Sequence, residues 1–261
     1  MKHLDGPSEP EIELLIEHVS SNRAVFWNPQ PLWKELLQSC FADQEILENE
    51  LGHMIEKYKE KFTQNIRQYL KHGMKMPHEQ DRRKEEIYIY DVVEGWFLEE
   101  IVARWIDCQL RRHFPEVKFN VEFSGKDKGR QFVFVKERGD ETSTDPDLTI
   151  TFPQGKFYLE LQTSRQGRRD LYDIKESKRN RLAKKEGVLL FALLPSEATF
   201  FLIPSEHLPK LKVRVNNAWG GKLTAYVTAE QIEKYGWGYY NFSEGFPPSL
   251  VEKLRFYVDP Q

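Results

Sequence analysis

Apolar residues recur every three or four positions along the first part of the chain, which is the spacing of amphipathic helices. This pattern predicts helices over residues 10–19, 31–41 and 43–73, with Ser8 and Pro10 as start signals and Gly73 as a stop signal. A helical region of this kind can clamp DNA, form a dimer or cover one side of a core. We favour the last two interpretations.

A polar segment over residues 74–86 interrupts the pattern and is the predicted linker. Helical spacing resumes over residues 87–114, where apolar residues occupy so broad an arc that the helix is expected to be largely buried. This helix also carries four carboxylates, at Glu94, Glu99, Glu100 and Asp107. Because a buried carboxylate needs a partner or a metal, the helix is a candidate contributor to a functional site.

The second half of the chain is dominated by strand patterns. Strands are predicted over residues 118–123, 131–136, 199–203, 210–217 and 223–227, and the continuous apolar run over 188–194 predicts a strand covered on both faces. A helix ending near Lys185 is expected to follow residues 163–169, and Thr228 is expected to cap a short helix over 229–235. The segment 236–245 is rich in glycine and aromatic residues, and we favour packing over DNA contact for it.

The stretch from Asp147 to Gln162 predicts a β-hairpin. Polar and apolar residues alternate over 147–152 and again over 156–162, and the residues between them form a tight Pro-Gln-Gly loop. A turn symmetric about Pro153 and Gln154 places Asp147 opposite Glu160. Side chains in such positions lie about 4.5–5.5 Å apart at Cβ, so the two carboxylates are expected to be neighbours.

Two carboxylates this close repel each other, by about 4 kcal/mol at ~4 Å and an effective dielectric near 20. A hard divalent cation would turn this repulsion into attraction, and Mg²⁺ typically takes one or two carboxylates. Gln162 shares the face of Asp147 and Glu160, whereas the opposite face of the hairpin is apolar. The alternative is a solvated strand face that carries these residues by chance, but the Asp-Pro-Asp entry and the Glu-Leu-Gln ending favour a site.

Pro146-Asp147 followed by Glu160-Leu161-Gln162 resembles the core motif of the PD-(D/E)xK nucleases, in the E-x-Q form of some type II restriction endonucleases. The resemblance spans about residues 94–204, and the element order of an acidic helix, two strands, a helix and a strand supports it. It implies a restriction-endonuclease-like α/β core with a mixed sheet, in which Asp147 and Glu160 bind Mg²⁺. The third position, usually Lys, holds or activates the attacking water, and here it is Gln162, a neutral amide.

In that family the helix before the core contributes a glutamate that aids the metal site. The spacing of Gly95, Glu99 and Val102 matches this pattern, so the resemblance assigns the role to Glu99, with Glu100 as the close alternative. A solvent-facing or salt-bridged glutamate is the other interpretation of either residue.

Composition narrows the functional classes. The chain of 261 residues is 39% hydrophobic and 30% charged, and its net charge of −3 excludes a bulk polycation. The two cysteines, Cys40 and Cys108, form no disulfide framework or zinc pattern, and no apolar run approaches 18 residues. We therefore expect a cytoplasmic protein with no membrane segment.

Contact with nucleic acid must then come from local patches. Over residues 165–185 the chain has nine basic residues against three acidic ones, a net excess that suits phosphate binding, although a solvated helix face is an equal alternative. Polar residues over 214–222 are expected to be exposed and suited to reading base edges. The predicted DNA-contacting residues are Arg165, Arg168, Arg169, Lys175, Lys178, Arg179, Arg214, Asn216, Asn217 and Lys222.

These observations predict a Mg²⁺-dependent endonuclease acting on double-stranded DNA, with Mn²⁺ or Ca²⁺ able to occupy the same site. A type II restriction endonuclease, which can act as a homodimer, is the favoured class. A helical region over 1–86, a nuclease core over 87–204 and a C-terminal extension over 205–261 are the expected domains. Three alternatives stay open: a repair or recombination nuclease, a non-catalytic nucleic-acid-binding module, and an interaction protein without metal.

Overall fold

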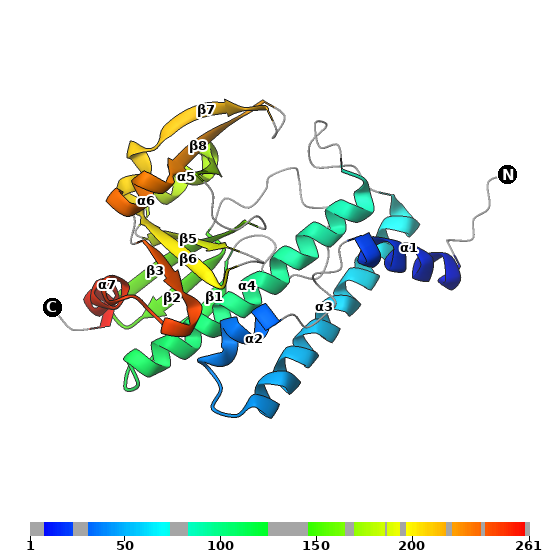
Figure 1. Ribbon diagram of the computed structural model, residues 1–261, viewed down its shortest axis with the longest axis horizontal. Coiled ribbons are helices and arrows are strands. Elements are labelled where there is room, and N and C mark those ends of the chain that lie inside the picture. Colours follow the sequence, from blue (N-terminus) through cyan, green and yellow to red (C-terminus); the bar gives the residue numbers. More distant parts are fainter. Residues whose placement is uncertain are drawn as a thin grey trace.

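The computed structural model describes residues 8–22, 31–73, 83–124, 146–164, 170–185, 187–193, 197–217, 221–235 and 238–258. A long helix runs through the middle of the molecule, with two β-sheets on one side and the N-terminal helices on the other (Figure 1). This is the mixed α/β fold with a helical N-terminal region that the sequence predicts. No helix in the described ranges is long and apolar enough to cross a membrane.

The N-terminal helices are α1 (Glu9–Asn22), α2 (Pro31–Gln38) and α3 (Gln44–His72). The Asp43 carboxylate accepts hydrogen bonds from the first turn of α3, and Gly73 ends the helix at a φ of 67°, a conformation that favours glycine. Residues at helical spacing on α3 are buried against the neighbouring helices, among them Leu47, Leu51, Tyr58, Phe62 and Ile66.

The central helix α4 (Glu85–His113) is buried on most of its circumference because it lies between the N-terminal helices and the main sheet. On one side Phe97 packs edge-on against Trp33 and Tyr58, with ring centroids 5.4 and 5.6 Å away. On the other side Trp105 packs against Phe200 of the sheet at 5.2 Å. The helix takes in the last two residues of the predicted linker, whose residues 74–82 lie outside the described ranges.

The main sheet contains β1 (Asn120–Phe123), β2 (Leu148–Phe152), β3 (Gly155–Ser164), β5 (Gly187–Leu193), β6 (Thr199–Pro204) and β9 (Tyr239–Asn241), in the order β1-β2-β3-β5-β6-β9. Neighbouring strands are antiparallel except for β3 and β5, which are parallel. This mixed sheet with helices beside it is the α/β arrangement that the sequence predicts. The predicted hairpin register is confirmed, because Leu148 pairs with Leu159 and Ile150 with Phe157.

The smaller sheet contains β4 (Leu171–Lys175), β8 (Lys222–Thr228) and β7 (Lys212–Asn216), in the order β4-β8-β7. The prediction of one continuous helix up to Lys185 is therefore wrong, since β4 precedes the short helix α5 (Glu176–Leu182). Tyr172 and Ile174 alternate with polar positions in β4 and are buried, a pattern that fits a strand paired with β8. The predicted strand over 131–136 lies outside the described ranges.

The C-terminal part of the chain contributes to both sheets. It contains the 3₁₀ helix η1 (Ser205–Lys210), the helix α6 (Ala229–Tyr235), the 3₁₀ helix η3 (Phe242–Glu244) and the helix α7 (Pro248–Val258). Thr228 caps α6 as expected, since its Oγ1 accepts a hydrogen bond of 3.2 Å from the backbone N–H of Gln231. In the glycine- and aromatic-rich segment, Phe242 is fully buried against Trp105, which supports the packing interpretation.

Candidate active site

Asp147 and Glu160 occupy the open end of the β2–β3 hairpin. They are the next positions beyond the Leu148–Leu159 pair. The Asp147 backbone oxygen accepts a hydrogen bond of 3.0 Å from the N–H of Ser124, directly after β1. Its Oδ2 accepts a second bond of 2.8 Å from the N–H of Leu161 in β3. The carboxylate of Asp147 is thus fixed to the strand that carries Glu160.

Glu160 has no exposed surface, and both of its carboxylate oxygens have cationic partners on α5. Nζ of Lys178 contacts Oε1, and Nη2 of Arg181 lies 3.3 Å from Oε2. Lys178 and Arg181 are three residues apart, so they share one face of the helix. The two ion pairs therefore hold α5 against the main sheet at the position of Glu160.

The charges of this cluster act on one another. Burial, followed by the charge of Asp147, raises the pKa of Glu160 above its ordinary value, and Lys178 and Arg181 oppose this rise. Burial disfavours the charged form of Lys178, but Asp147 and Glu160 outweigh it, so the pKa of Lys178 is raised. The lysine therefore stays protonated beside two carboxylates that disfavour each other's charge.

Glu99 and Glu100 differ in their surroundings. Glu100 is buried and binds the N-terminal helices: its oxygens accept hydrogen bonds of 2.7 and 3.0 Å from Lys57 and one of 2.6 Å from the hydroxyl of Tyr58. Burial opposes its ionisation, but these donors lower the pKa of Glu100 overall. Glu99, by contrast, is half-buried, and its charge acts on Lys178. Of the two glutamates, Glu99 is the one whose charge acts on the lysine that contacts Glu160.

Gln162 has a structural partner in the smaller sheet. Its Nε2 donates a hydrogen bond of 2.8 Å to the backbone oxygen of Asp173 in β4. The Asp173 carboxylate in turn accepts bonds of 3.1 and 2.8 Å from Arg214 and one of 2.9 Å from Thr224. One end of the Gln162 amide therefore connects the two sheets.

Further cations gather beside Lys178. Lys175 is exposed at the surface, but desolvation by the surrounding chain lowers its pKa, and the charges of Lys178, Lys222 and Arg83 lower it further, whereas Glu160 opposes the change. These residues come from β4, α5, β8 and the segment before α4, and their charges act on Lys175; Nη1 of Arg83 also donates a 2.8 Å hydrogen bond to Oδ2 of Asp91. Because an anion relieves repulsion among cations, the arrangement suits a phosphate group.

Other predicted DNA-contacting residues make contacts within the protein or lie outside the described ranges. Residues 165–169, which include Arg165, Arg168 and Arg169, are among the latter. Nη1 of Arg179 donates a 3.0 Å bond to the Leu211 carbonyl, and this side chain is only 15% exposed. Arg214 is exposed, but both of its bonded nitrogens face Asp173.

The prediction that Asn216 is exposed is wrong. Asn216 ends β7 and is 8% exposed, because it closes the β7–β8 connection: its backbone oxygen accepts a 3.0 Å hydrogen bond from the N–H of Gly221. Asn217 is exposed and Lys222 is half-buried. The sequence predicts Arg181 only as one of the nine basic residues of a phosphate-binding surface, whereas in the structure it is an ion-pair partner of Glu160. Its three-residue spacing from Lys178 on a helix is the sequence signal that both side chains lie on one face.

The donor set fits a hard divalent cation in part. Asp147 and Glu160 supply two carboxylates, which is the number that Mg²⁺ usually takes from a protein. Among the described residues no group of three or more His, Cys, Asp or Glu side chains is placed to hold a metal ion, so Glu99 does not complete a three-carboxylate cluster. Lys178 and Arg181 now offset the charge that a metal would neutralise.

The chain matches no protein-family model and no curated protein in sequence. Among solved structures, it has a slight likeness to Hjc of Archaeoglobus fulgidus, a Holliday junction resolvase from an archaeal hyperthermophile. The two share 9% identity at a TM-score of 0.32, over 58% of this chain and 96% of the resolvase. A likeness of this size does not indicate a shared activity.

Proposed function

We propose that this protein is a metal-dependent nuclease that hydrolyses phosphodiester bonds of double-stranded DNA, with Asp147 and Glu160 as its catalytic carboxylates. The observation that carries the proposal is a fully buried glutamate beside a second carboxylate, surrounded by cations from several elements. Such an arrangement is costly to a fold, and ionisable groups with strongly altered pKa values are concentrated at functional sites.

Asp147 and Glu160 would hold Mg²⁺, with Mn²⁺ or Ca²⁺ as substitutes, and Glu99 would add a carboxylate at the edge of the site. When bound, a divalent cation polarises phosphoryl oxygens and lowers the pKa of bound water. Lys178 contacts Oε1 of Glu160 and Arg181 lies beside Oε2, so a metal ion would compete with these two cations for the charge of the carboxylate.

Gln162 and Lys178 would together replace the lysine that usually occupies the third position of the resembling motif. Nε2 of Gln162 is engaged by Asp173, so Oε1 is the atom that would accept a hydrogen bond from the attacking water and position it. A neutral amide supplies no positive charge. Lys178 reaches the same carboxylate from α5, and it supplies the cation that the third position of the resembling motif lacks.

DNA would bind through its phosphates to Lys175, Lys222 and Arg83, together with the arginines at 165, 168 and 169. A type II restriction endonuclease is the class that we favour, because the elements on either side of the core offer surfaces for reading sequence. A repair or recombination nuclease would use the same catalytic residues. Dimerisation would follow from the restriction assignment.

A non-catalytic nucleic-acid-binding module is the second candidate. One observation favours it: Glu160 already has two cationic partners and Gln162 is engaged by the smaller sheet. In that case the ion pairs are structural, and the cations beside them bind phosphate without cleavage.

Cleavage of supercoiled plasmid and of linear mixed-sequence DNA, with Mg²⁺, Mn²⁺, Ca²⁺ or chelator, tests the proposal. We expect wild type to cleave DNA with Mg²⁺ or Mn²⁺. Asp147→Asn and Glu160→Gln should lose this cleavage, whereas Glu252→Gln, a matched control at an exposed position of α7, should retain it. Discrete fragments from linear DNA would support the restriction class. DNA binding without cleavage would overturn the nuclease in favour of the binding module.

A thermal melt gives a second readout that is independent of activity. Metal that binds only the folded protein stabilises it by about 2.7 kcal/mol at ~100 times the dissociation constant. We expect wild type and Glu252→Gln to show a concentration-dependent rise in Tm at constant ionic strength, and Asp147→Asn to show none. An equal rise in all three proteins would mean that the two carboxylates are not the metal site.

A further inference from the structure

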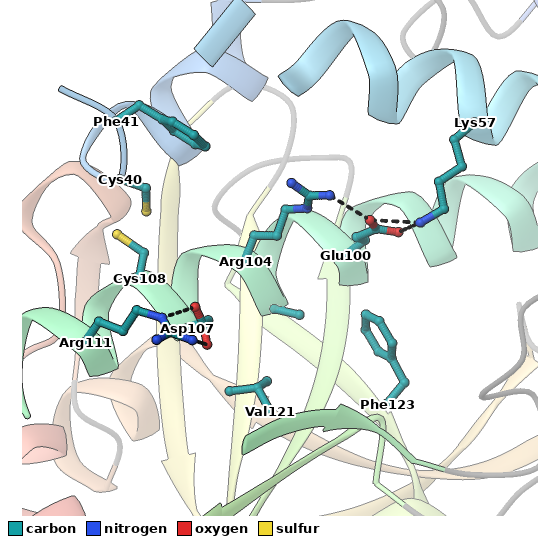
Figure 2. Close-up of a pocket in the computed structure, with 11 residues that line it drawn as sticks. Cys40, Phe41, Lys57, Glu100, Arg104, Asp107, Cys108, Arg111, Val121 and Phe123 are labelled. Carbon is teal, nitrogen blue, oxygen red and sulfur yellow. Dashed lines mark hydrogen bonds and ion pairs between the residues drawn. The ribbon is translucent and has the colours of Figure 1, made fainter. Parts of the chain in front are cut away.

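Cys40 and Cys108 are the chain's two cysteines, and the fold brings them together although they are far apart in sequence. Cys40 lies in the turn after α2, and Cys108 lies on α4. Their sulfur atoms point toward each other at the wall of a cavity (Figure 2). This pairing is separate from the Asp147–Glu160 site and does not depend on the proposed nuclease activity.

The turn that carries Cys40 is held firmly against α4. Nη2 of Arg112 donates a hydrogen bond of 2.6 Å to the Ser39 carbonyl, and Nε2 of Gln109 donates one of 3.2 Å to the Ser39 hydroxyl. The sulfur of Cys108 lies 4.0 Å from the same carbonyl. Gln109 and Arg112, which follow Cys108 within one turn of α4, thus fix the residue that precedes Cys40 and hold its turn beside Cys108.

The two thiols are chemically unequal. The interaction with the Cys40 side chain lowers the pKa of Cys108, and the charge of Arg112 lowers it further against the effect of burial. The interaction with Cys108, followed by burial, raises the pKa of Cys40. Cys108 is therefore the member that ionises first, and a thiolate is the form that attacks disulfides.

Reagents in solution have a route to the pair. Both cysteines are half-buried and line a cavity of about 650 Å³ between α4, the turn after α2 and the edge strand β1. The same cavity is lined by Lys57, Arg104 and Arg111, each of which is ion-paired with Glu100, Glu50 or Asp107 (Figure 2).

We propose that Cys40 and Cys108 are a modification site, at which a low-molecular-weight disulfide oxidises them to an intramolecular disulfide. The Cys108 thiolate attacks one sulfur of the reagent, whose S–S bond breaks and releases one thiolate. Cys40 then loses its proton and attacks the Cys108 sulfur, which releases the second thiolate. The protein loses two electrons, the reagent gains them, and the two protons of the cysteines pass to the released thiolates.

The bond would tie the end of α2 to α4, the helix that also carries Glu99. A cross-link over so long a stretch of chain restricts the unfolded state, so we expect the oxidised protein to melt roughly 5–15 °C above the reduced protein. Reduction with dithiothreitol should reverse the shift.

Glutathione disulfide is the probe for the test, applied to the full chain under nitrogen. We expect wild type to lose both free thiols and two hydrogen atoms in intact mass, with no glutathione retained and no change from monomer to cross-linked dimer. In Cys40→Ser, which cannot complete the second step, Cys108 should retain one glutathionyl group. In Cys108→Ser, modification of Cys40 should be at least ~10-fold slower than that of Cys108 in Cys40→Ser.

The double variant Cys40→Ser/Cys108→Ser is the blank, since the chain has no cysteine besides these two. Wild type that keeps glutathione on either cysteine, or that cross-links only between chains, would overturn the proposal, because the sulfur atoms then do not reach each other. Equal rates for the two single variants would overturn the assignment of Cys108 as the attacking group.

Discussion

The Nε2 of Gln162 donates a hydrogen bond of 2.8 Å to the backbone oxygen of Asp173, and this bond joins the main sheet to the smaller one. Gln162 thus holds two parts of the fold together at the position where the resembling nuclease motif usually has a lysine. Positive charge reaches Glu160 instead from Lys178 on α5. The first prediction tests whether this division of roles is functional.

Lys178→Met should lower the cleavage rate roughly 100-fold, the order of loss seen when one group that stabilises transition-state charge is removed. Gln162→Lys in the Lys178→Met background should restore part of the rate, because it returns a cation to the motif position. Single-turnover cleavage at saturating Mg²⁺ measures both, with melts to establish that each variant is folded. Full activity in Lys178→Met would remove this lysine from the mechanism.

The adjacent glutamates of α4 should respond differently to the same substitution. Glu99→Gln is expected to lower cleavage with little loss of stability, since Glu99 acts on Lys178 and is half-buried. Glu100→Gln should instead destabilise the fold by roughly 2 kcal/mol, less than a fully buried pair because Lys57 is 50% exposed. Urea unfolding measures the loss of stability, and cleavage per folded molecule measures the loss of activity. If Glu100→Gln lowered cleavage and Glu99→Gln destabilised the fold, Glu100 would be the glutamate of the site and Glu99 the structural one.

Salt dependence identifies the phosphate contacts. Lys175→Gln/Lys222→Gln should weaken DNA binding at all sequences and reduce the slope of log K against log salt by about 0.9 for each lost contact. Arg179→Gln is the matched control, because its guanidinium already binds the Leu211 carbonyl and its slope should not change. A slope that falls in the control as much as in the double variant would place the contact surface along α5 instead.

The pH dependence of thiol alkylation tests the pairing of the cysteines. An ordinary cysteine ionises near pH ~8.5. The interaction with the Cys40 side chain and the charge of Arg112 lower the pKa of Cys108, so half-maximal alkylation by iodoacetamide should occur at a lower pH. Cys40→Ala and Arg112→Gln each remove one of these causes, and each should move the midpoint upward. An unchanged midpoint in both variants would show that neither group acts on the Cys108 thiol.

Local pattern was enough to determine the hairpin of Asp147 and Glu160. Its register follows from the alternation of polar and apolar residues, because slipping the strands by one position would expose Leu148 and Leu159. The caps at Asp43, Gly73 and Thr228 are local for the same reason: each side chain or backbone conformation acts on its own helix end. These features need no distant partner, so the sequence alone determines them.

The surroundings of the carboxylates were decided by tertiary structure. The strand β4 exists because β8, some fifty positions later in the chain, supplies its hydrogen bonds, and that strand sets where α5 begins and so where Lys178 and Arg181 point. Glu99 and Glu100 have the same local pattern, and only the packing of α3 against α4 gives Lys57 and Tyr58 to Glu100. Burial and pairing depend on contacts between segments distant in sequence, which local periodicity does not encode.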